Sequence, residues 1–359
     1  MKFSDVLEIK NGRNQKQVEN PNGKYPIYGS GGIMGYADDY ICEPYTVIIG
    51  RKGTINNPIY VETPFWNVDT AFGLQAKKDI LHPKYLYYFC VHFDFEALNT
   101  TVTIPSLTKA NLLDIDIPLP PLAEQTEIVD ILTSVDELIK IKKQQLELFD
   151  ELTKSRFIEL FGDNNYPSEP LDNNVVEMFI GPFGSSLKNE VFVDEENGFC
   201  MVYEQKHAIQ KTMNVPTRYV PKSKYEELKR FTILGGDIIV SCRGTIGEIF
   251  IVPDNAPMGI MHPSIMKIRL NTEKYNQKFF VFALEQYMDE HNAEAKGSGV
   301  KMAVSATVLG QSDFVVPPME VQNQFAAFVE QTDKSKLAVQ QSIAELEELK
   351  KALMQKCFG

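Results

Sequence analysis

Residues 120–162 read PPLAEQTEIVDILTSVDELIKIKKQQLELFDELTKSRFIELFG, and residues 317–359 read PPMEVQNQFAAFVEQTDKSKLAVQQSIAELEELKKALMQKCFG. The two stretches align without a gap at a shift of 197 residues, which pairs Gln125 with Gln322. Each opens with two prolines, contains no internal proline or glycine, and closes on a glycine, which is the pattern of one long helix. An internal repeat with one long helix in each copy therefore organises the chain.

Both predicted helices carry a wide apolar stripe at seven-residue spacing, which is typical of helices that pair along their length. We expect the two stripes to pack against each other and to contact partner proteins. The alternative is that each helix packs only on its own domain. The residues that we assign to this helix-pair or partner interface are Ile128, Val135, Leu138, Leu146, Phe149, Leu152, Phe325, Phe328, Val339, Leu346 and Leu349.

The segments in front of the two helices also resemble each other. The first copy contains VIIGRKGTIN from Val47, which matches IIVSCRGTIG from Ile238, and both read as strands that turn at Gly-Thr. The first copy also contains KYLYYF from Lys84, which matches KFFVFA from Lys278 and is expected to be helical. Strands rich in Val, Ile and Tyr, combined with short helices, predict an α+β fold with two similar domains.

The resulting order is domain, helix, domain, helix. We set the boundaries at residues 1–119 for the first domain, 120–162 for its helix, 163–170 for an irregular linker, 171–316 for the second domain and 317–359 for the second helix. At about 1.5 Å per residue, the first helix would be about 58 Å long, enough to span more than one turn of DNA.

The composition points to a soluble, cytoplasmic protein without a metal site. The chain has 359 residues, long enough for two domains, and no run of about 18 uncharged apolar residues that could cross a membrane. Its five cysteines and five histidines are scattered, without the close spacing of zinc ligands. The net charge of −12 counts against DNA binding, but residues 121–165 alone contribute −5, from 5 basic and 10 acidic side chains.

Taken together, KYPIYGSGGIMGY at residues 24–36, the two Gly-Thr-Ile turns and the duplicated IPLPPLAEQ and VVPPMEVQ helix starts resemble the Type I restriction-modification specificity subunits. The resemblance covers nearly the whole chain. It implies two target-recognition domains that are joined and separated by two long antiparallel helices, in an internal pseudo-twofold repeat. Each domain would read half of a split site in double-stranded DNA.

The same resemblance implies partners that carry the chemistry. The helices would dock two methyltransferase subunits, and restriction endonuclease subunits would join through them. The S-adenosylmethionine is expected in the methyltransferase, so this chain is expected to be non-catalytic and to hold no cofactor of its own.

Cations beside the two Gly-Thr turns are the main candidates for DNA contact, because arginine can pair with guanine or phosphate and glycine allows close backbone approach. A β-turn with a solvated cation is the alternative. The residues that we assign to DNA binding are Lys24, Tyr28, Ser30, Tyr36, Arg51, Lys52, Thr54, Lys188, Arg243, Thr245 and Lys301, with Lys206 and Lys211 as further candidates. The second domain carries GPFGSSLKNE at 181–190 in place of a close copy of GSGGIMGY, so we expect the domains to read different bases.

Two other functions are weighed against this interpretation. Residues 57–60, Asn-Pro-Ile-Tyr, approximate the N-P-P-Y motif of amino-group DNA methyltransferases, but the third residue differs and no glycine-rich S-adenosylmethionine loop accompanies them. A loop that leads into a strand explains the string equally well. The second is a coiled-coil scaffold or interaction protein without DNA readout, which the acidic charge favours; sequence-selective DNA binding would exclude it.

Overall fold

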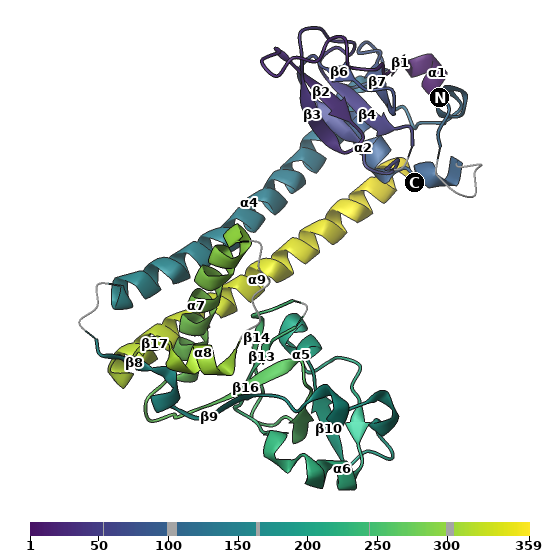
Figure 1. Ribbon diagram of the computed structural model, residues 1–359. Coiled ribbons are helices and arrows are strands. Elements are labelled where there is room, and N and C mark those ends of the chain that lie inside the picture. The colour runs from purple at the N-terminus through teal and green to yellow at the C-terminus, as the bar shows by residue number, and fades with distance from the viewer. Residues whose placement is uncertain (53, 99–105, 163–165, 244, 299–304) are drawn as a thin grey trace. The chain divides into compact units, whose positions relative to one another are not determined.

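The computed structural model describes residues 1–52, 54–98, 106–162, 166–243, 245–298 and 305–359. The chain divides into two compact units. Unit 1 contains Met1–Glu147 and Leu337–Gly359, and unit 2 contains Leu148–Lys336. The two long helices, α4 (Leu122–Phe161) and α9 (Met319–Phe358), each contribute one part to each unit (Figure 1).

Helices α4 and α9 are 40 residues long each and occupy the duplicated segments of the sequence. Both start directly after a pair of prolines, since proline lacks the backbone donor that a helix interior requires. They run antiparallel within each unit, because residues later in α4 pair with residues earlier in α9. The ion pairs that join them are Asp136–Lys350 at 2.6 Å and Lys143–Glu347 at 3.0 Å in unit 1, and Asp150–Lys336 at 2.6 Å in unit 2.

A buried glutamine near the start of each long helix fixes the helix to its own domain. Gln125 accepts a hydrogen bond from the backbone N–H of His82 at 2.8 Å and donates to the carbonyl oxygens of Ile80 and Pro120 at 3.0 and 2.8 Å. Gln322 accepts from Asn276 at 2.8 Å and donates to Lys274 and Pro317 at 2.9 and 2.8 Å. The repeat seen in the sequence is therefore repeated in the hydrogen bonding.

Unit 1 contains two sheets. The antiparallel sheet has the strand order β1-β7-β4-β5, and the small sheet has the order β3-β2-β6, in which β2 and β6 are parallel. The strands are β1 (Leu7–Asn11), β2 (Tyr25–Gly29), β3 (Gly32–Ala37), β4 (Thr46–Gly50), β5 (Ile59–Val61), β6 (Trp66–Asn67) and β7 (Ala71–Ala76). The short helices are α1 (Phe3–Val6), α2 (Pro83–His92) and α3 (Lys109–Leu113).

The core of unit 1 lies between its antiparallel sheet and the helices. Inward-facing residues of alternating strand positions, such as Val47 and Leu74, pack with α2, with α4 and with the end of α9. Phe358 of α9 is buried there, with its ring centroid 5.0 Å from that of Tyr85. Because burial of aromatic surface stabilises strongly, this contact ties α9 to the first domain.

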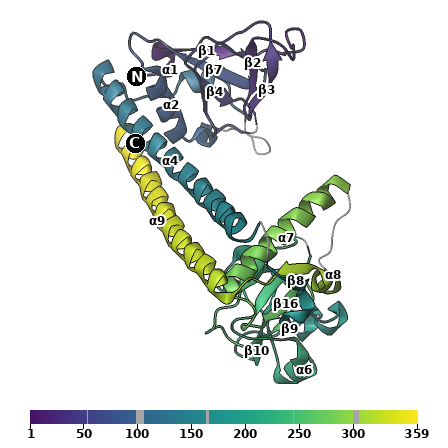
Figure 2. The ribbon, with the colours of Figure 1, turned by 90° about the vertical axis from the view of Figure 1, so that its left-hand side faces the viewer.

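Unit 2 contains two four-stranded sheets and a two-stranded one. Their strand orders are β14-β13-β16-β9, β11-β10-β15-β12 and β17-β8. The strands are β8 (Ser168–Pro170), β9 (Val175–Ile180), β10 (Cys200–Tyr203), β11 (Tyr219–Val220), β12 (Thr232–Ile233), β13 (Ile238–Ser241), β14 (Ile249–Ile251), β15 (Gly259–Met261), β16 (Ile265–Leu270) and β17 (Asp313–Val315). The helices are α5 (Gln205–Gln210), α6 (Lys222–Glu227), α7 (Gln277–Ser298) and α8 (Ala306–Gln311), and Figure 2 shows α7 and α8 in a second view.

The main sheets of the two units have the same topology. In unit 1 the order β5-β4-β7-β1, and in unit 2 the order β14-β13-β16-β9, place equivalent strands of the repeat side by side. The aromatic contact also recurs, since Phe161 at the end of α4 lies 4.7 Å from Phe279 of α7, centroid to centroid. The predicted α+β fold with two similar domains and two long helices is therefore confirmed.

The end of the segment that was predicted to be an irregular linker, residues 163–170, is a strand. Residues 163–165 lie outside the described residues, and Ser168–Pro170 form β8, which pairs with β17 instead of remaining irregular. The pairing is antiparallel and starts from Val315, close to the point where α9 begins. Strand pairing between distant segments overrides the local preference of a proline-containing stretch at a sheet edge.

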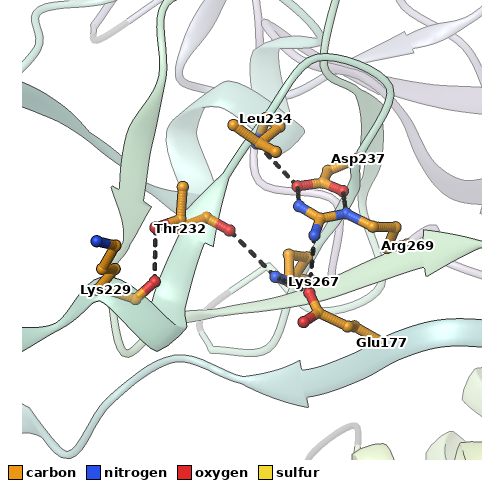
Figure 3. Close-up of polar contacts among 7 residues, drawn as sticks. All are labelled: Glu177, Lys229, Thr232, Leu234, Asp237, Lys267 and Arg269. Carbon is orange, nitrogen blue, oxygen red and sulfur yellow. Dashed lines mark hydrogen bonds and ion pairs between the residues drawn. The ribbon is translucent and has the colours of Figure 1, made fainter.

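A charged network joins the two larger sheets of unit 2 (Figure 3). Lys267 of β16 is 1% exposed and donates to the Glu177 carboxylate at 2.6 Å and to the Thr232 carbonyl of β12 at 3.1 Å. Arg269 binds both carboxylate oxygens of Asp237, at 2.7 and 2.8 Å, and Glu177 at 3.0 Å. The buried charges are thus neutralised within the network, as burial requires.

The structure places the predicted interface residues of α4 and α9 in three groups. Val135, Phe325 and Val339 are buried, and Ile128, Leu146, Phe149, Phe328 and Leu346 are half-buried. Leu138, Leu152 and Leu349 are exposed, by 46%, 49% and 48%, so within this chain they do not pack between the helices, and their assignment to a partner interface stays a prediction. A two-helix contact buries one side of each helix, and these leucines lie on another side.

Among the helices of the described residues, none has both the length and the apolar composition needed to cross a membrane. Within the same residues, no group of three or more His, Cys, Asp or Glu side chains is placed to hold a metal ion.

Candidate nucleic-acid interface

In unit 1 the turn after β4 carries two exposed cations, Arg51 and Lys52. The backbone N–H of Arg51 donates to the Thr70 carbonyl at 2.8 Å, which fixes the turn against the start of β7. The guanidinium carbon of Arg51 lies 5.7 Å from the centroid of the Phe72 ring. Neither cation forms an ion pair within the described part of the chain, so both are available to an outside anion.

The glycine-rich loop between β2 and β3 lies beside this turn. A Cβ atom added to Gly50 would stand 3.0 Å from the Cβ of Ser30 and 2.0 Å from the Thr54 carbonyl oxygen. The structure therefore brings Ser30 next to the turn that holds Arg51, as the DNA-binding assignment requires. Thr54 itself has an exposed side chain.

The aromatic and lysine candidates of this loop differ in exposure. Tyr36 on β3 is exposed, whereas Tyr28 is half-buried with its ring 5.4 Å from that of Phe65. Burial, and to a lesser extent the nearby Tyr36 hydroxyl, raises the pKa of Tyr28, so its phenol stays protonated. The half-buried ring of Tyr28 therefore contributes to the packing of unit 1 as well as to its surface. Lys24 is exposed and lies 5.4 Å from the Tyr25 ring centroid.

The equivalent turn of unit 2 follows β13 and carries Arg243 and Thr245. The backbone N–H of Cys242 donates to Ser264 at 2.8 Å, which matches the bond made by Arg51 in unit 1. The Ser241 hydroxyl donates to the Thr245 carbonyl at 2.6 Å and stabilises the turn. Arg243 is exposed and forms no ion pair among the described residues. Because Cys242 matches Arg51 in this hydrogen bond, the next residue, Arg243, occupies the position in unit 2 that Lys52 occupies in unit 1.

The structure corrects one part of the predicted repeat. The segment from Gly181 does not replace the glycine-rich loop of unit 1; it replaces the segment that follows β1. The backbone N–H of Gly12 donates to Ala71 at 3.3 Å, and that of Gly181 donates to the equivalent Ile265 at 2.9 Å. A side chain at either glycine would collide with a neighbouring carbonyl, at 1.7 Å for Gly12 and 2.3 Å for Gly181, so both positions need glycine for close backbone approach.

The true counterpart of the glycine-rich loop in unit 2 begins at Glu204. In unit 1, β2 and β6 are parallel and the N–H of Val68 donates to the Tyr28 carbonyl at 3.0 Å. In unit 2, β10 and β15 are parallel and the N–H of His262 donates to the Tyr203 carbonyl at 2.9 Å. Glu204 therefore stands where unit 1 has a glycine, and His262 stands where unit 1 has Val68.

Glu204 is the centre of a cluster of which the sequence reasoning named Lys206 but missed Glu204, Arg218 and His262. Its buried carboxylate contacts Arg218 Nη2 and lies 2.8 Å from Lys206 Nζ. Desolvation lowers the pKa of His262, on which the charges of Glu204, Arg218, Arg243 and Lys206 also act. The cluster thus places two cations, Arg218 and Lys206, on one buried acid at the end of the sheet, although the whole chain is acidic.

The sequence did contain a signal for this cluster. Both loops follow a short apolar run that ends in tyrosine, KYPIY at 24–28 and CMVY at 200–203. A comparison of the strands, instead of the glycines, would have aligned them. Arg218 could not be found this way, because its place beside Glu204 arises from the pairing of β10 with β11.

The remaining lysine candidates of unit 2 have different surroundings. Lys188 is exposed without an ion pair in the described structure, and Lys211 pairs with Glu285 of α7 at 3.3 Å, which makes it a weaker candidate. Lys301 lies outside the described residues. Phe183, five residues before Lys188, is 87% exposed and was not predicted.

The Asn-Pro-Ile-Tyr string of unit 1 leads into strand β5, as the structural alternative expected. Tyr60 lies within β5 and packs on Tyr45 and Tyr87, with ring centroids 6.5 and 5.7 Å away. Burial raises its pKa to about 12. Tyr60 therefore packs against the core of unit 1, whereas Asn57 is exposed.

Each unit also contains a cavity beside its pair of long helices. The cavity of unit 1 has a volume of about 420 Å³ and that of unit 2 about 740 Å³. Residues at equivalent positions of the repeat line both cavities: Asp136, His92, Glu347 and Lys351 in unit 1, and Asp333, Gln286, Asp150 and Lys154 in unit 2. The chain thus presents two related concave surfaces of mixed charge.

Two α+β units of one topology each carry exposed cations and polar loops at one end of their strands, an arrangement typical of modular proteins that contact an anionic polymer at two places. A family model described as "Type I restriction modification DNA specificity domain" matches residues 1–148 and 189–348. The chain belongs to this family.

Known relatives agree with this assignment. The chain is 26% identical, over 98% of its length and 90% of the relative's, to a protein of Methanocaldococcus jannaschii named as the type I restriction enzyme MjaX specificity subunit. A crystal structure of the S subunit of a type I restriction-modification system from M. genitalium covers 100% of this chain and 95% of that one, with a TM-score of 0.57 and 17% identity. A structure from work on complex assembly and conformational transition of a type I system covers 99% and 96%, with a TM-score of 0.61 and 16% identity.

These findings confirm the family that the sequence resembles and the fold class inferred from it. They support the role of specificity subunit over that of a scaffold without DNA readout.

Proposed function

We propose that this chain reads a two-part sequence in double-stranded DNA, one part with each unit, and thereby directs a type I restriction-modification complex. The observation that carries the proposal is the equivalence of the two exposed cation turns, Lys52 in unit 1 and Arg243 in unit 2, on sheets of the same topology. Two related modules on one chain recognise two short sequences, as the two subunits of a dimer do for a palindrome.

The two half-sites should differ in sequence. Where unit 1 has Gly29 and Val68, unit 2 has Glu204 and His262, so the loops at equivalent positions offer different hydrogen-bonding groups. Base edges in the major groove are distinguished by their donor and acceptor patterns. Unequal loops therefore favour an asymmetric target over a palindrome.

The experiment is a methylation assay with the complete complex. We expect that Arg51→Ala or Lys52→Ala relaxes one half of the target, that Arg243→Ala relaxes the other half, and that each lost base contact costs about 1–3 kcal/mol. The matched controls are Lys78→Ala in unit 1 and Lys274→Ala in unit 2, which are exposed lysines beyond the opposite ends of strands β7 and β16. If all three test variants keep the activity and the sequence selectivity of the wild type, these cations do not contact the bases and contribute only to the structure of the turns.

We also propose that catalysis belongs to the partners. Two methyltransferase subunits, which would carry S-adenosylmethionine, are proposed to dock along α4 and α9, and restriction endonuclease subunits to join through them. The two equivalent cavities beside the helices support two like partners. The exposed Leu138 and Leu152 of α4 and Leu349 of α9 offer apolar surface for such contacts.

A charge at one of these exposed leucines tests the docking proposal. Leu138→Glu should weaken binding of the methyltransferase, because a carboxylate would have to be desolvated in the interface. Gln144→Glu, at an exposed polar position of the same helix, is the control and should bind normally. Affinity is measured by calorimetry or co-purification, and equal binding of Leu138→Glu and the wild type would place the partner elsewhere.

A further inference from the structure

In unit 2 an arginine is held by contacts on two sides at the end of the sheet that faces the proposed DNA site. The guanidinium carbon of Arg218 lies 3.9 Å from the centroid of the Phe192 ring, and its Nη2 contacts the Glu204 carboxylate. The side chain is 35% exposed. Its Nη1 and Nε donate no hydrogen bond to any described residue. The N–H groups on these two nitrogens therefore remain for an outside acceptor, in a guanidinium plane that Phe192 and Glu204 fix.

Glu204 is held in its charged form by the same contacts. Burial opposes ionisation, but the hydrogen bonds from Arg218 and from Lys206 outweigh it, and the pKa of Glu204 lies below its ordinary value. Glu204 is only 8% exposed, so loss of the Arg218 contact would leave a buried charge without its partner. The position of the guanidinium is therefore more restricted than it would be beside a surface carboxylate. Glu204 is thus a fixed anchor for the guanidinium.

The Arg218–Glu204 pair lies at a loop in which the two units differ in charge. Unit 1 has glycine and serine at the equivalent loop, without any charge, and its neighbouring position is Val68 instead of His262. Cys242, directly before Arg243, donates to the Ser264 carbonyl, and the Ser264 hydroxyl lies 2.8 Å from His262. His262 donates to the carbonyl of Tyr203, directly before Glu204, so the pair and the exposed turn of unit 2 lie at one end of the sheets. A phosphate contact requires only a mobile cation, whereas base readout requires an oriented planar donor set.

We infer that Arg218 reads a guanine in the half-site of unit 2, through two hydrogen bonds to N7 and O6, and that Glu204 is the positioning residue that holds its guanidinium for this contact. The inference rests on the proposed function. It assigns to this loop of unit 2 a guanine contact that the uncharged loop of unit 1 at residues 29–35 cannot make.

The test uses the complete complex with the methyltransferase and its methylated target, in which each guanine in turn is replaced by 7-deazaguanine. With the wild type we expect one replacement to weaken binding by part of the about 5- to 150-fold range for a lost bidentate contact, because 7-deazaguanine lacks the N7 acceptor but keeps O6. Arg218→Ala, which loses both bonds, should weaken binding of the natural target by a larger factor and show no further loss at that guanine. Arg218→Lys keeps the charge but not the planar donor pair, so it should lose the guanine preference with the fold intact.

Glu204→Gln tests the positioning role. It removes the charge but can still accept a hydrogen bond, so we expect a partial loss of the guanine preference with an unchanged dependence of binding on salt. Arg230→Ala is the matched control, because Arg230 is an exposed arginine of the same unit that lies 5.5 Å from the Phe179 ring and forms no ion pair in the described structure. This variant should leave the preference at the Arg218 guanine unchanged.

Three results would overturn the inference while leaving the proposed function intact. One is a loss in Arg218→Ala that is equal for all sequences and lowers the salt dependence, as for a phosphate contact. The second is unchanged binding in both Arg218 variants, which would make the pair structural. The third is a target in which replacement of each guanine by 7-deazaguanine leaves binding of the wild-type complex unchanged. If the wild-type complex shows no bipartite preference at all, the proposed function fails, and this inference fails with it.

Discussion

Replacement of Glu177 by alanine should destabilise unit 2 far more than replacement of its partner Lys267 by methionine. In the wild type, Lys267 is buried and donates to Glu177 at 2.6 Å, while its ammonium also lies 4.6 Å from the centroid of the Phe179 ring. Glu177→Ala leaves the Thr232 carbonyl and this ring to stabilise the buried cation. Arg269 retains both bonds to Asp237, so the loss falls on Lys267.

The expected magnitudes follow from which charge stays behind. Breaking a buried ion pair by removal of one partner costs about 3–5 kcal/mol, and we expect the lower end, about 3 kcal/mol, for Glu177→Ala because water can reach the vacated carboxylate position. Lys267→Met removes the buried charge, keeps an apolar side chain of similar volume and leaves Glu177 with Arg269 at 3.0 Å. Its cost should be within about 1 kcal/mol.

Hydrogen exchange of the β9 and β16 amides measures the stability of unit 2. Trp66, the only tryptophan, belongs to unit 1, so its fluorescence during urea unfolding is an internal control that neither variant should change. Equal protection losses in Glu177→Ala and Lys267→Met, or a larger loss in the methionine variant, would show that the network does not behave as a buried charge that needs compensation.

The pH dependence gives a second check on the same pair. Hydrogen bonding to Lys267 lowers the pKa of Glu177, against the opposing effect of burial. A depressed folded-state pKa contributes stability above the unfolded-state pKa of about 4.3, and this contribution is lost as pH falls through the folded-state pKa. Glu177→Gln has no such contribution to lose, so the stabilities of this variant and the wild type should converge in acid; a constant difference would refute the assignment.

Three further outcomes are expected. Gln125→Ala, which leaves the backbone groups of His82, Ile80 and Pro120 without their side-chain partner, should lower the stability of unit 1 by about 2–3 kcal/mol in urea titrations followed by Trp66 fluorescence, whereas Gln322→Ala should not change that transition. Phe161→Ala removes a buried ring that contacts Phe279 and should cost unit 2 about 3–5 kcal/mol in scanning calorimetry, with a loss below about 1 kcal/mol contradicting the packing. Burial raises the pKa of Cys42 to about 12, so this thiol should react with a disulfide reagent only after unfolding, and mass spectrometry that found it labelled in the native protein would contradict its burial.

Much of the architecture could be predicted because it is encoded locally or by repetition. The duplicated helices are visible as a gap-free repeat with proline starts and glycine ends, and α4 and α9 follow those stretches. Strands β4 and β13, and the cations Lys52 and Arg243 that follow them, also lie at equivalent places, as the aligned segments predicted, while Gly53 and Gly244 of the predicted turns lie outside the described residues. Helix periodicity and turn chemistry depend on residues close in sequence, so they can be read without knowledge of the tertiary structure.

The sequence by itself therefore determined the order of domains, the two paired helices and the family, while tertiary structure decided which residues meet. The match of Gly181 with Gly12, the contact of Arg218 with Glu204 and the exposure of Leu138 all depend on which distant strands and helices pack together. An apolar stripe indicates that a helix has a partner, but the geometry of packing selects the buried side. Strand pairing between segments far apart in the chain has no local signature, and for that reason the place of Arg218 beside Glu204 became visible only in the folded structure.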